Sequence, residues 1–484
     1  MTKQEFGDWQ TPLVLAEEAM ARVAEFCGSP SLVLESTCGE GAFLVAAAHR
    51  FKDARLLGYE LREDYAATAR SRLPVSRSTV NVADFFGVDW ERELSSEQGH
   101  LLVTGNPPWV TNSVLGALGS GNLPDKRNFK RLSGLDAMTG KSNFDVSEWM
   151  ILKLLAAIRD RRATIAVLCK SAVARKVIDF ASANAWNVRP GGLWQIDAKK
   201  HFNAAVDAVL FICETGTLPR TSGWPVYASI DANRPTSTMA VINGSVIADA
   251  DGLAKTAHLI GRCDPPWRSG MKHDCSRVME LKREENGAWR NGLGEVVSIE
   301  DEVVFPFLKS SDVAKGRSTS LRGVVVPQRA LGEDTRLLER TAPRAWSYLS
   351  AHRDALAARK SSIYRGQPEF AIFGIGPYSF APWKVAISGL YKRYAFALVG
   401  PQDGRPVMVD DTCYFLPFNE EAAARRAIDA LRSPVAQQFF AARIFWDAKR
   451  PISKAILQQL DLDALIGPRE GLPQQQLTFA AVSG

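Results

Sequence analysis

A short apolar run, 101–105, ends in the tetrapeptide Asn106-Pro107-Pro108-Trp109. Such a run predicts a buried parallel strand, and open α/β sheets bind their ligands at the carboxyl ends of the strands. The two prolines fix φ and remove two backbone donors, so a stiff loop presents carbonyl oxygens, an amide side chain and an indole face. These groups suit a planar amine. The alternative is a proline-rich turn with a surface tryptophan.

The chemistry of a nucleobase amine explains why such a loop is useful. Its lone pair is delocalised into the ring, and acceptors that bond both N–H groups favour the pyramidal, nucleophilic form. Asn106 Oδ1 and the Pro107 carbonyl could be those acceptors, and Trp109 could stack on the base. We therefore interpret residues 106–109 as a candidate catalytic loop.

Three strand ends upstream predict a site for an adenosyl group. A strand at 31–35 leads into a glycine turn, where Gly39 and Gly41 let a ligand approach the backbone and the next helix start offers N–H groups to an anion. A second strand ends at Glu60, 19 residues beyond Gly41, where an acid could accept from both ribose hydroxyls. An exposed helix-capping acid is the alternative for Glu60.

The third of these strands, near 78–82, leads to Asp84 and Phe85. Asp84 could accept from an adenine amine, and Phe85 could cover the adenine ring. The N-terminal half therefore has the pattern of a nucleotide-binding α/β sheet.

Taken in order, the segments GDWQTP, LESTCGEGAFL, GYEL, ADFF and NPPW resemble the motifs of the amino-group DNA methyltransferases that use S-adenosylmethionine. Their order resembles the gamma arrangement, in which adenine N6 is the usual acceptor, and the match covers roughly residues 6–214. The resemblance implies a Rossmann-like class I methyltransferase sheet, mostly parallel with one antiparallel strand, and a second α+β domain that recognises the DNA target.

The resemblance also implies roles for individual residues. Thr11 and Glu35 would lie around the methionine end of the cofactor, with the loop that contains Cys38, Gly39 and Gly41. Glu60 would hold the ribose, and Asp84 and Phe85 the adenine. Ser36-Thr37 stands where the family often has Pro-Ala, which puts details of the methionine contact in doubt.

The length of 484 residues predicts two domains. We expect the catalytic domain at 1–220, a linker at 221–262, where Gly223, Pro225 and Pro235 would break long elements, and the target-recognition domain at 263–484. Segments beginning at Trp267, Val304, Ala381 and Asp411 resemble recurring segments of such recognition domains.

Candidate nucleic-acid contacts come from three regions. Phe202 resembles a second aromatic wall for the target base, with a plain core position as the alternative. The segment after Trp109 is basic and resembles a loop over the site, although it could be a solvated insertion. A second basic set, interleaved with aromatics, suits a face that follows phosphates or else a solvated surface. The basic residues of the two sets are Lys126, Arg127 and Lys130, and Lys309, Lys384, Arg393, Lys449 and Arg450.

Composition excludes several other classes. The charge of +6 and pI near 8.9 permit a polyanionic partner without requiring one. No apolar stretch approaches about 18 residues and no signal pattern begins the chain, so we expect a cytoplasmic protein away from membranes. Seven scattered cysteines indicate reduced thiols. His258, Cys263, His273 and Cys275 lack zinc-finger spacing, so we predict no metal.

The sequence therefore predicts a site-specific methyltransferase that acts on the N6 amine of an adenine flipped out of duplex DNA. Cytosine N4 is the closest rival acceptor. A glutamine side chain of a protein is less suited because of the large C-terminal domain, and an idle DNA-binding module is less suited because the motifs are intact. We expect a monomer on DNA with no fused nuclease, since no segment precedes Gly7. A separate cognate restriction endonuclease could be its partner.

Overall fold

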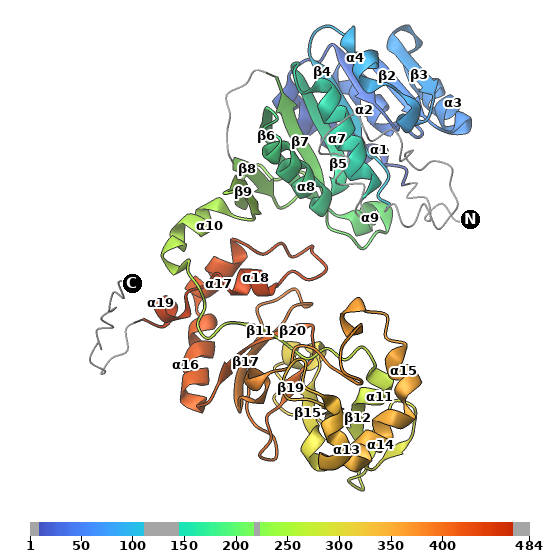
Figure 1. The fold of residues 1–484 in the computed structure, drawn as a ribbon. Coiled ribbons are helices and arrows are strands. Elements are labelled where there is room, and N and C mark those ends of the chain that lie inside the picture. The colour runs from blue at the N-terminus through green and yellow to red at the C-terminus, as the bar shows by residue number, and fades with distance from the viewer. Residues whose placement is uncertain (1–8, 111–144, 217–222, 468–484) are drawn as a thin grey trace, which may run out of the picture. The chain divides into compact units, whose positions relative to one another are not determined.

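The computed structural model describes residues 9–110, 145–216 and 223–467. The chain divides into two compact units, Met1–Asp251 and Gly252–Gly484 (Figure 1). Lys126, Arg127 and Lys130 lie outside the described residues. No helix of the described ranges combines the length and the apolar character that a membrane crossing requires.

The first unit is built on a ten-stranded sheet in the order β10-β9-β8-β6-β7-β5-β4-β1-β2-β3. Neighbours from β3 to β5 are parallel, and β7 is antiparallel to both β5 and β6. This confirms the predicted mostly parallel sheet with an antiparallel strand. The strands are β1 (Leu32–Glu35), β2 (Arg55–Glu60), β3 (Ser78–Val82), β4 (Leu101–Gly105), β5 (Ala163–Lys170), β6 (Val188–Ile196), β7 (Ala208–Thr215), β8 (Gly223–Tyr227), β9 (Ser237–Ile242) and β10 (Ser245–Ile247).

Helices cover both faces of this sheet, which is why its central strands are continuous apolar runs. Every residue of β1, β4 and β7 is buried. Helix α1 packs on α2, and α7 packs on both α4 and α8. The helices of this unit are α1 (Leu13–Cys27), α2 (Ala42–Arg50), α3 (Glu63–Arg72), α4 (Trp90–Ser95), α7 (Val146–Ile158), α8 (Ser171–Ala183) and α9 (Ala198–Phe202), with 3₁₀ turns η2 (Val75–Arg77) and η3 (Phe85–Gly87).

The segment predicted as a linker differs from that expectation, because much of it extends the sheet. β8 pairs with β6, and β9 and β10 add two antiparallel strands at that edge. Pro225 lies within β8 opposite Thr238, although we expected it to break an element. The prolines suggested a linker because the sequence does not reveal that this segment extends the sheet. Pro225 precedes Val226 and Tyr227, the residues of β8 that pair with β6, so at the proline itself β8 pairs with β9 alone among the described strands.

The second unit has an α+β fold with two sheets (Figure 1). One is six-stranded, in the order β14-β13-β12-β16-β15-β19, and the other is four-stranded, in the order β11-β20-β17-β18, with α16 against it. The strands are β11 (Arg268–Ser269), β12 (Glu280–Arg283), β13 (Trp289–Asn291), β14 (Val296–Val297), β15 (Val304–Leu308), β16 (Arg322–Val325), β17 (Trp383–Ser388), β18 (Phe396–Val399), β19 (Met408–Val409) and β20 (Cys413–Phe418).

Short helices surround these sheets, and separate apolar clusters form the core beneath them. The α-helices are α10 (Ala250–Lys255) at the boundary of the two units, α11 (Ser276–Met279), α12 (Ser310–Ala314), α13 (Leu338–Thr341), α14 (Pro343–Ala351), α15 (Arg353–Ala357), α16 (Glu421–Leu431), α17 (Pro434–Ala441), α18 (Lys454–Leu457) and α19 (Leu462–Ile466). The 3₁₀ turns are η5 (Ala257–Leu259), η6 (Asp301–Val303), η7 (Thr335–Leu337), η8 (Ser362–Tyr364) and η9 (Pro377–Phe380).

Candidate active site

The sheet order brings three predicted site residues to one edge. β1 lies between β2 and β4, so Glu35, Glu60 and Asn106 all stand at or just after the carboxyl ends of adjacent parallel strands. This edge is where α/β sheets of this kind bind ligands.

The glycine loop follows β1 and is fixed by backbone hydrogen bonds. Cys38 N donates to Tyr59 O at 2.8 Å, and Gly41 N donates to Cys38 O at 2.7 Å. Gly39 and Gly41 have φ of +51° and +82°, which glycine adopts without strain. A Cβ on Gly39 would lie 2.5 Å from Gln10 Oε1. The loop therefore requires glycine both for its conformation and for close packing.

Glu60 is held in place by the same loop. Its Oε2 accepts from Gly39 N at 2.8 Å, and its Oε1 accepts from Arg62 N at 3.0 Å. Each carboxylate oxygen has two lone pairs, so one on each remains for a further donor. The arrangement fits the predicted contact with the two hydroxyls of a ribose.

Glu35 is a buried acid whose Oε2 has no hydrogen-bond partner among the described residues, and its side chain is 3% exposed. Burial raises the pKa of this carboxyl well above its ordinary value, a bond from the Leu44 backbone opposes the rise, and the charge of Glu60 adds to it. A Cβ on Gly105 would lie 3.1 Å from Glu35 Cγ. An unpaired buried acid suits an ammonium group, such as the amino group at the methionine end of the cofactor.

Asp84 and Phe85 follow β3. Asp84 Oδ1 accepts from Phe86 N at 3.0 Å and so caps η3. Phe85 is 3% exposed, with its ring centroid 5.0 Å from that of Trp90 and 6.1 Å from that of Trp149. The phenyl ring is thus packed among aromatic side chains, and the adenine contact of both residues stays a prediction.

Asn106 is oriented by the segment that precedes α1. Its Nδ2 donates to Trp9 O and to Thr11 Oγ1, both at 3.3 Å. Its Oδ1 is buried and accepts no hydrogen bond from the described residues. Because both amide hydrogens point to protein acceptors, the amide oxygen is the atom left for a ligand donor. The sequence did not reveal this contact, and the cofactor role expected of Thr11 stays a prediction.

Trp109 and Phe202 belong to the core of the first unit, with exposures of 7% and 4%. Their rings meet edge to face, with centroids 5.2 Å apart. Trp109 Nε1 donates to Leu168 O at 3.4 Å. For Phe202 this placement agrees with the core alternative, and a role of either ring beside a base stays a prediction.

Lys170 is a site residue that the sequence reasoning missed. It ends β5, and its Nζ donates to Trp109 O at 3.0 Å and to Asp145 Oδ2 at 2.6 Å. Asp145 in turn caps α7 by accepting from Ser147 N and Ser147 Oγ. One lysine thus links the candidate catalytic loop to α7. The signal that could have found it is a cation ending an otherwise apolar strand beside β4.

The predicted phosphate contacts in the second unit differ widely in their surroundings. Arg393, Lys449 and Arg450 are exposed, although Arg393 also donates to Ala314 O. Lys309 is half-buried and forms an ion pair with Glu280.

Lys384 contradicts the expectation of a surface contact. It is 1% exposed, and its Nζ donates to Ala381 O at 2.7 Å. Burial lowers its pKa to about 7. Every residue of β17 after Trp383 is buried, so the strand has no solvent-facing side at Lys384, and a charged residue type alone does not indicate a surface position there.

In the described ranges, no group of three or more histidine, cysteine, aspartate or glutamate side chains is placed to hold a metal ion. Cys263 is 1% exposed within an apolar cluster.

Comparison with known proteins assigns the class of this fold and site. No family model matches the chain. The chain is 39% identical over 470 residues to the type II methyltransferase M.NspV of Nostoc sp. (strain ATCC 29411 / PCC 7524), covering 96% of this chain and 98% of that protein. It is 29% identical to the type II methyltransferase M.CvrRI of Paramecium bursaria Chlorella virus XZ-6E over 105 residues, 22% of this chain and 25% of that one.

Among solved structures, the fold is similar to that of the type IIL restriction-modification enzyme MmeI in complex with DNA. The TM-score is 0.51 at 14% identity, and the match covers 95% of this chain and 65% of the MmeI chain. The fold and the strand-end site define a class I methyltransferase whose cofactor is S-adenosylmethionine. The chain belongs to the type II methyltransferases, the DNA methyltransferases of restriction-modification systems. This confirms the family that the sequence motifs indicated.

Proposed function

We propose that this methyltransferase transfers a methyl group from S-adenosylmethionine to the N6 amine of an adenine flipped out of duplex DNA. The observation that carries the proposal is the buried Asn106 Oδ1, which has no partner among the described residues, while Nδ2 of the same amide is held by Trp9 and Thr11. An acceptor fixed in this way suits the N–H of an incoming amine.

The catalytic contribution of the chain would be positioning and polarisation. When bound, S-adenosylmethionine supplies an electrophilic methyl group on a sulfonium, whose sulfur would leave as a neutral thioether. Asn106 Oδ1 and the Pro107 carbonyl would accept from the two amine hydrogens and so localise the lone pair on the nitrogen. Acceptors fixed before the reaction need no reorganisation as charge develops on the amine.

The surroundings of Glu35 and Glu60 support the cofactor contacts proposed for them. The unpaired Glu35 Oε2 would take the cofactor's ammonium group, and Glu60, fixed by Gly39 N and Arg62 N, would take the ribose hydroxyls. Asp84 and Phe85 would contact the adenine of the cofactor.

Duplex DNA as the substrate is supported by the relatives. M.NspV is a type II methyltransferase, and the MmeI structure contains DNA. Extrusion of the base would cost a few kcal/mol, which stacking on Trp109 and contacts with phosphates would offset. We propose that the protein acts as a monomer, as the modification partner of a separate restriction endonuclease.

Methylation of plasmid DNA tests this function. Purified protein, S-adenosylmethionine and unmodified plasmid should yield N6-methyladenine at one short sequence, read by sequencing that detects modified bases. N4-methylcytosine at that sequence would mean that the acceptor is cytosine N4 and not adenine N6. Absence of methylated bases, together with methylation of a protein substrate, would contradict DNA as the acceptor.

A further inference from the structure

A cavity of about 450 Å³ lies in the second unit, between α15 and the segment that contains η8. Its lining includes four cationic side chains, Arg353, Arg359, Lys360 and Arg365, and a single acid, Glu369. We call this cavity the basic pocket. None of these residues was among the DNA contacts predicted from the sequence.

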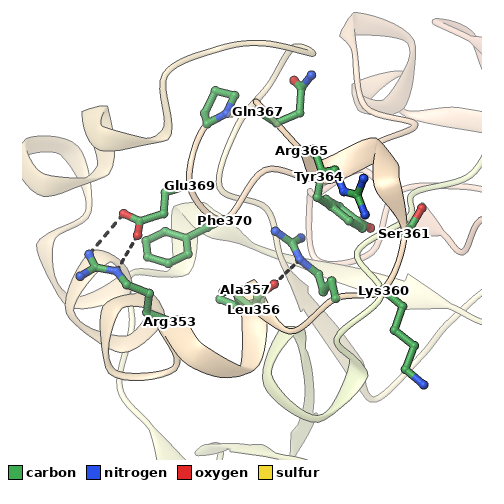
Figure 2. A pocket seen from close by; sticks show the side chains of 12 residues that line it. Arg353, Leu356, Ala357, Lys360, Ser361, Tyr364, Arg365, Gln367, Glu369 and Phe370 are labelled. Carbon is green, nitrogen blue, oxygen red and sulfur yellow. Dashed lines mark hydrogen bonds and ion pairs between the residues drawn. The ribbon is translucent and has the colours of Figure 1, made fainter.

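One cation of the basic pocket is neutralised within the protein. Arg353 forms an ion pair with Glu369, with Nε 2.5 Å from Oε1 and Nη2 3.2 Å from Oε2. Figure 2 shows this pair on one side of the pocket and Tyr364 and Arg365 on the other. The only acid of the lining is therefore engaged.

A second cation, Arg359, has a structural role in the wall. Its Nε donates to Leu356 O at 2.7 Å and its Nη1 to Ala371 O at 2.7 Å, and its guanidinium lies 3.7 Å from the centre of the Tyr364 ring. These contacts connect the end of α15, residue 371 and η8. The wall is thus fixed by bonds that need no ligand.

The other two cations have no acid partner in the part of the chain that the structure describes. Lys360 and Arg365 are exposed, and neither forms an ion pair or a side-chain hydrogen bond with any described residue. Ser361 and Gln367 add a hydroxyl and an amide to the same lining. The Lys360 ammonium extends away from Arg365 (Figure 2), so the two uncompensated cations offer two separate contacts to phosphate oxygens rather than one shared site.

We propose that the basic pocket lies against the phosphate backbone of the DNA substrate, and that Lys360 and Arg365 each contact one phosphate. This proposal rests on the proposed function, which supplies a duplex with a dense row of phosphates. Contacts of this kind position a duplex without reading its sequence. They therefore increase affinity in a salt-dependent manner.

The test compares DNA affinity over a range of salt concentrations. The duplex carries the sequence that the wild-type protein methylates in plasmid DNA. The full-length double variant Lys360→Ala with Arg365→Ala should bind it more weakly at low salt, and the slope of log affinity against log salt should become shallower by about 1 for each lost contact. Single-turnover methylation at saturating DNA should stay unchanged.

A control variant removes the same charge elsewhere in the chain. Lys255 in α10 and Arg426 in α16 are exposed, and alanine is the best helix former, so Lys255→Ala with Arg426→Ala should keep the fold and the wild-type slope. Equal slopes in both double variants would overturn the basic pocket as a DNA site. If the wild-type protein methylates no DNA, the proposed function fails first.

Inorganic phosphate separates a DNA phosphate from a free anion. At constant ionic strength, replacing chloride with phosphate should displace the duplex more strongly from the wild-type protein than from the Lys360→Ala, Arg365→Ala variant. If calorimetry detects phosphate binding while the variant keeps the wild-type DNA slope, the basic pocket is a site for small anions and the DNA assignment is wrong.

Discussion

Asn106 shows how the fold decides which end of an amide side chain is available to a ligand. The motif supplies an amide beside two prolines, but an amide has both a donor end and an acceptor end. Trp9 O and Thr11 Oγ1 take the donor end and leave Oδ1 as a buried acceptor. The residue thereby becomes specific for a ligand that donates.

We predict that Asn106→Ala reduces the single-turnover rate of methyl transfer by about 10²-fold or more, by analogy with the loss of one transition-state hydrogen bond in other enzymes. Affinity for S-adenosylmethionine, measured by calorimetry, should change little. Asn184→Ala serves as the control, because Asn184 is exposed at the end of α8. Wild-type turnover in Asn106→Ala would make residues 106–109 a structural turn.

Lys384 provides a prediction on stability and pH. Its pKa falls to about 7 in the folded protein because it is buried, from an ordinary value of 10.5. Between these two pH values the unfolded chain binds more protons, so the lysine's contribution makes the protein more stable as pH rises. Below pH about 7 Lys384 is protonated in the folded protein as well, and the full free-energy cost of its buried charge applies.

Lys384→Met should therefore raise the free energy of unfolding, by about 1–3 kcal/mol below neutral pH after the loss of the bond to Ala381 O. The difference should shrink as pH rises toward 10.5. Urea unfolding at several pH values measures it, with the exposed Lys454→Met as the control. If the gain in the free energy of unfolding of Lys384→Met did not depend on pH, the lowered pKa of Lys384 would be wrong. If Lys384→Met bound DNA with a shallower salt dependence than the wild-type protein, Lys384 would be a phosphate contact after all.

At the scale of elements, β5 ends in a lysine that joins two of its neighbours. Lys170 connects the loop after β4 to the N-terminus of α7 through Trp109 O and Asp145. A second ion pair, Lys176 with Glu148, connects α8 to α7 at the same 2.6 Å, and no contact of this pair with the candidate catalytic loop is seen among the described residues. A comparison of the two ion pairs can therefore distinguish an effect on the position of the loop from an effect on the stability of the fold.

We expect Lys170→Met to lower the free energy of unfolding by about 1–3 kcal/mol, because it leaves the buried Asp145 carboxylate without this cation. Lys176→Met, which removes the ion pair with Glu148 between α8 and α7, is the matched control. Only Lys170→Met should also lower kcat, since Trp109 O loses its donor, while the KM for S-adenosylmethionine stays nearly constant. Chemical denaturation and steady-state kinetics measure the two effects. Equal kcat in both variants would limit Lys170 to a structural role.

At the scale of the whole molecule, the chain comprises two units with separate apolar cores. The residues assigned to the cofactor and the reacting base all lie in the first unit, and the basic pocket lies in the second. Cofactor binding should therefore stabilise the first unit and leave the second unit nearly unchanged.

We predict that S-adenosylmethionine slows amide exchange around the ends of β1, β2 and β4 and leaves the second unit nearly unchanged. At a hundredfold excess over Kd, binding to the folded state adds about 2.7 kcal/mol. Hydrogen exchange read by mass spectrometry measures this protection. Glu60→Ala should reduce it, because the variant lacks the carboxylate that holds Gly39 N. Protection confined to residues 252–467 would contradict the assigned site.

Strand-end motifs predicted the sheet and the family well, because apolar runs, glycine turns and the residues after them are local in sequence. They failed for contacts between distant segments. Nothing near Thr11 indicates that it accepts from Asn106, and nothing near Lys384 reveals that it points inward. The prolines of 221–262 likewise do not show that β8 finds an edge of the sheet beside β6.

The sequence by itself determined which residue types follow β1, β2 and β4, because periodicity and turn chemistry are encoded locally, and the resemblance of those motifs to a known family indicated the methyltransferase class. Only the tertiary structure decided which atoms those residues leave available. Within the described part of the chain, Asn106 Oδ1 and Glu35 Oε2 have no hydrogen-bond partner and Lys360 and Arg365 have no acid partner, because the fold decides which distant segments come within reach of these atoms. Burial and pairing depend on the whole fold, so no local pattern can specify them.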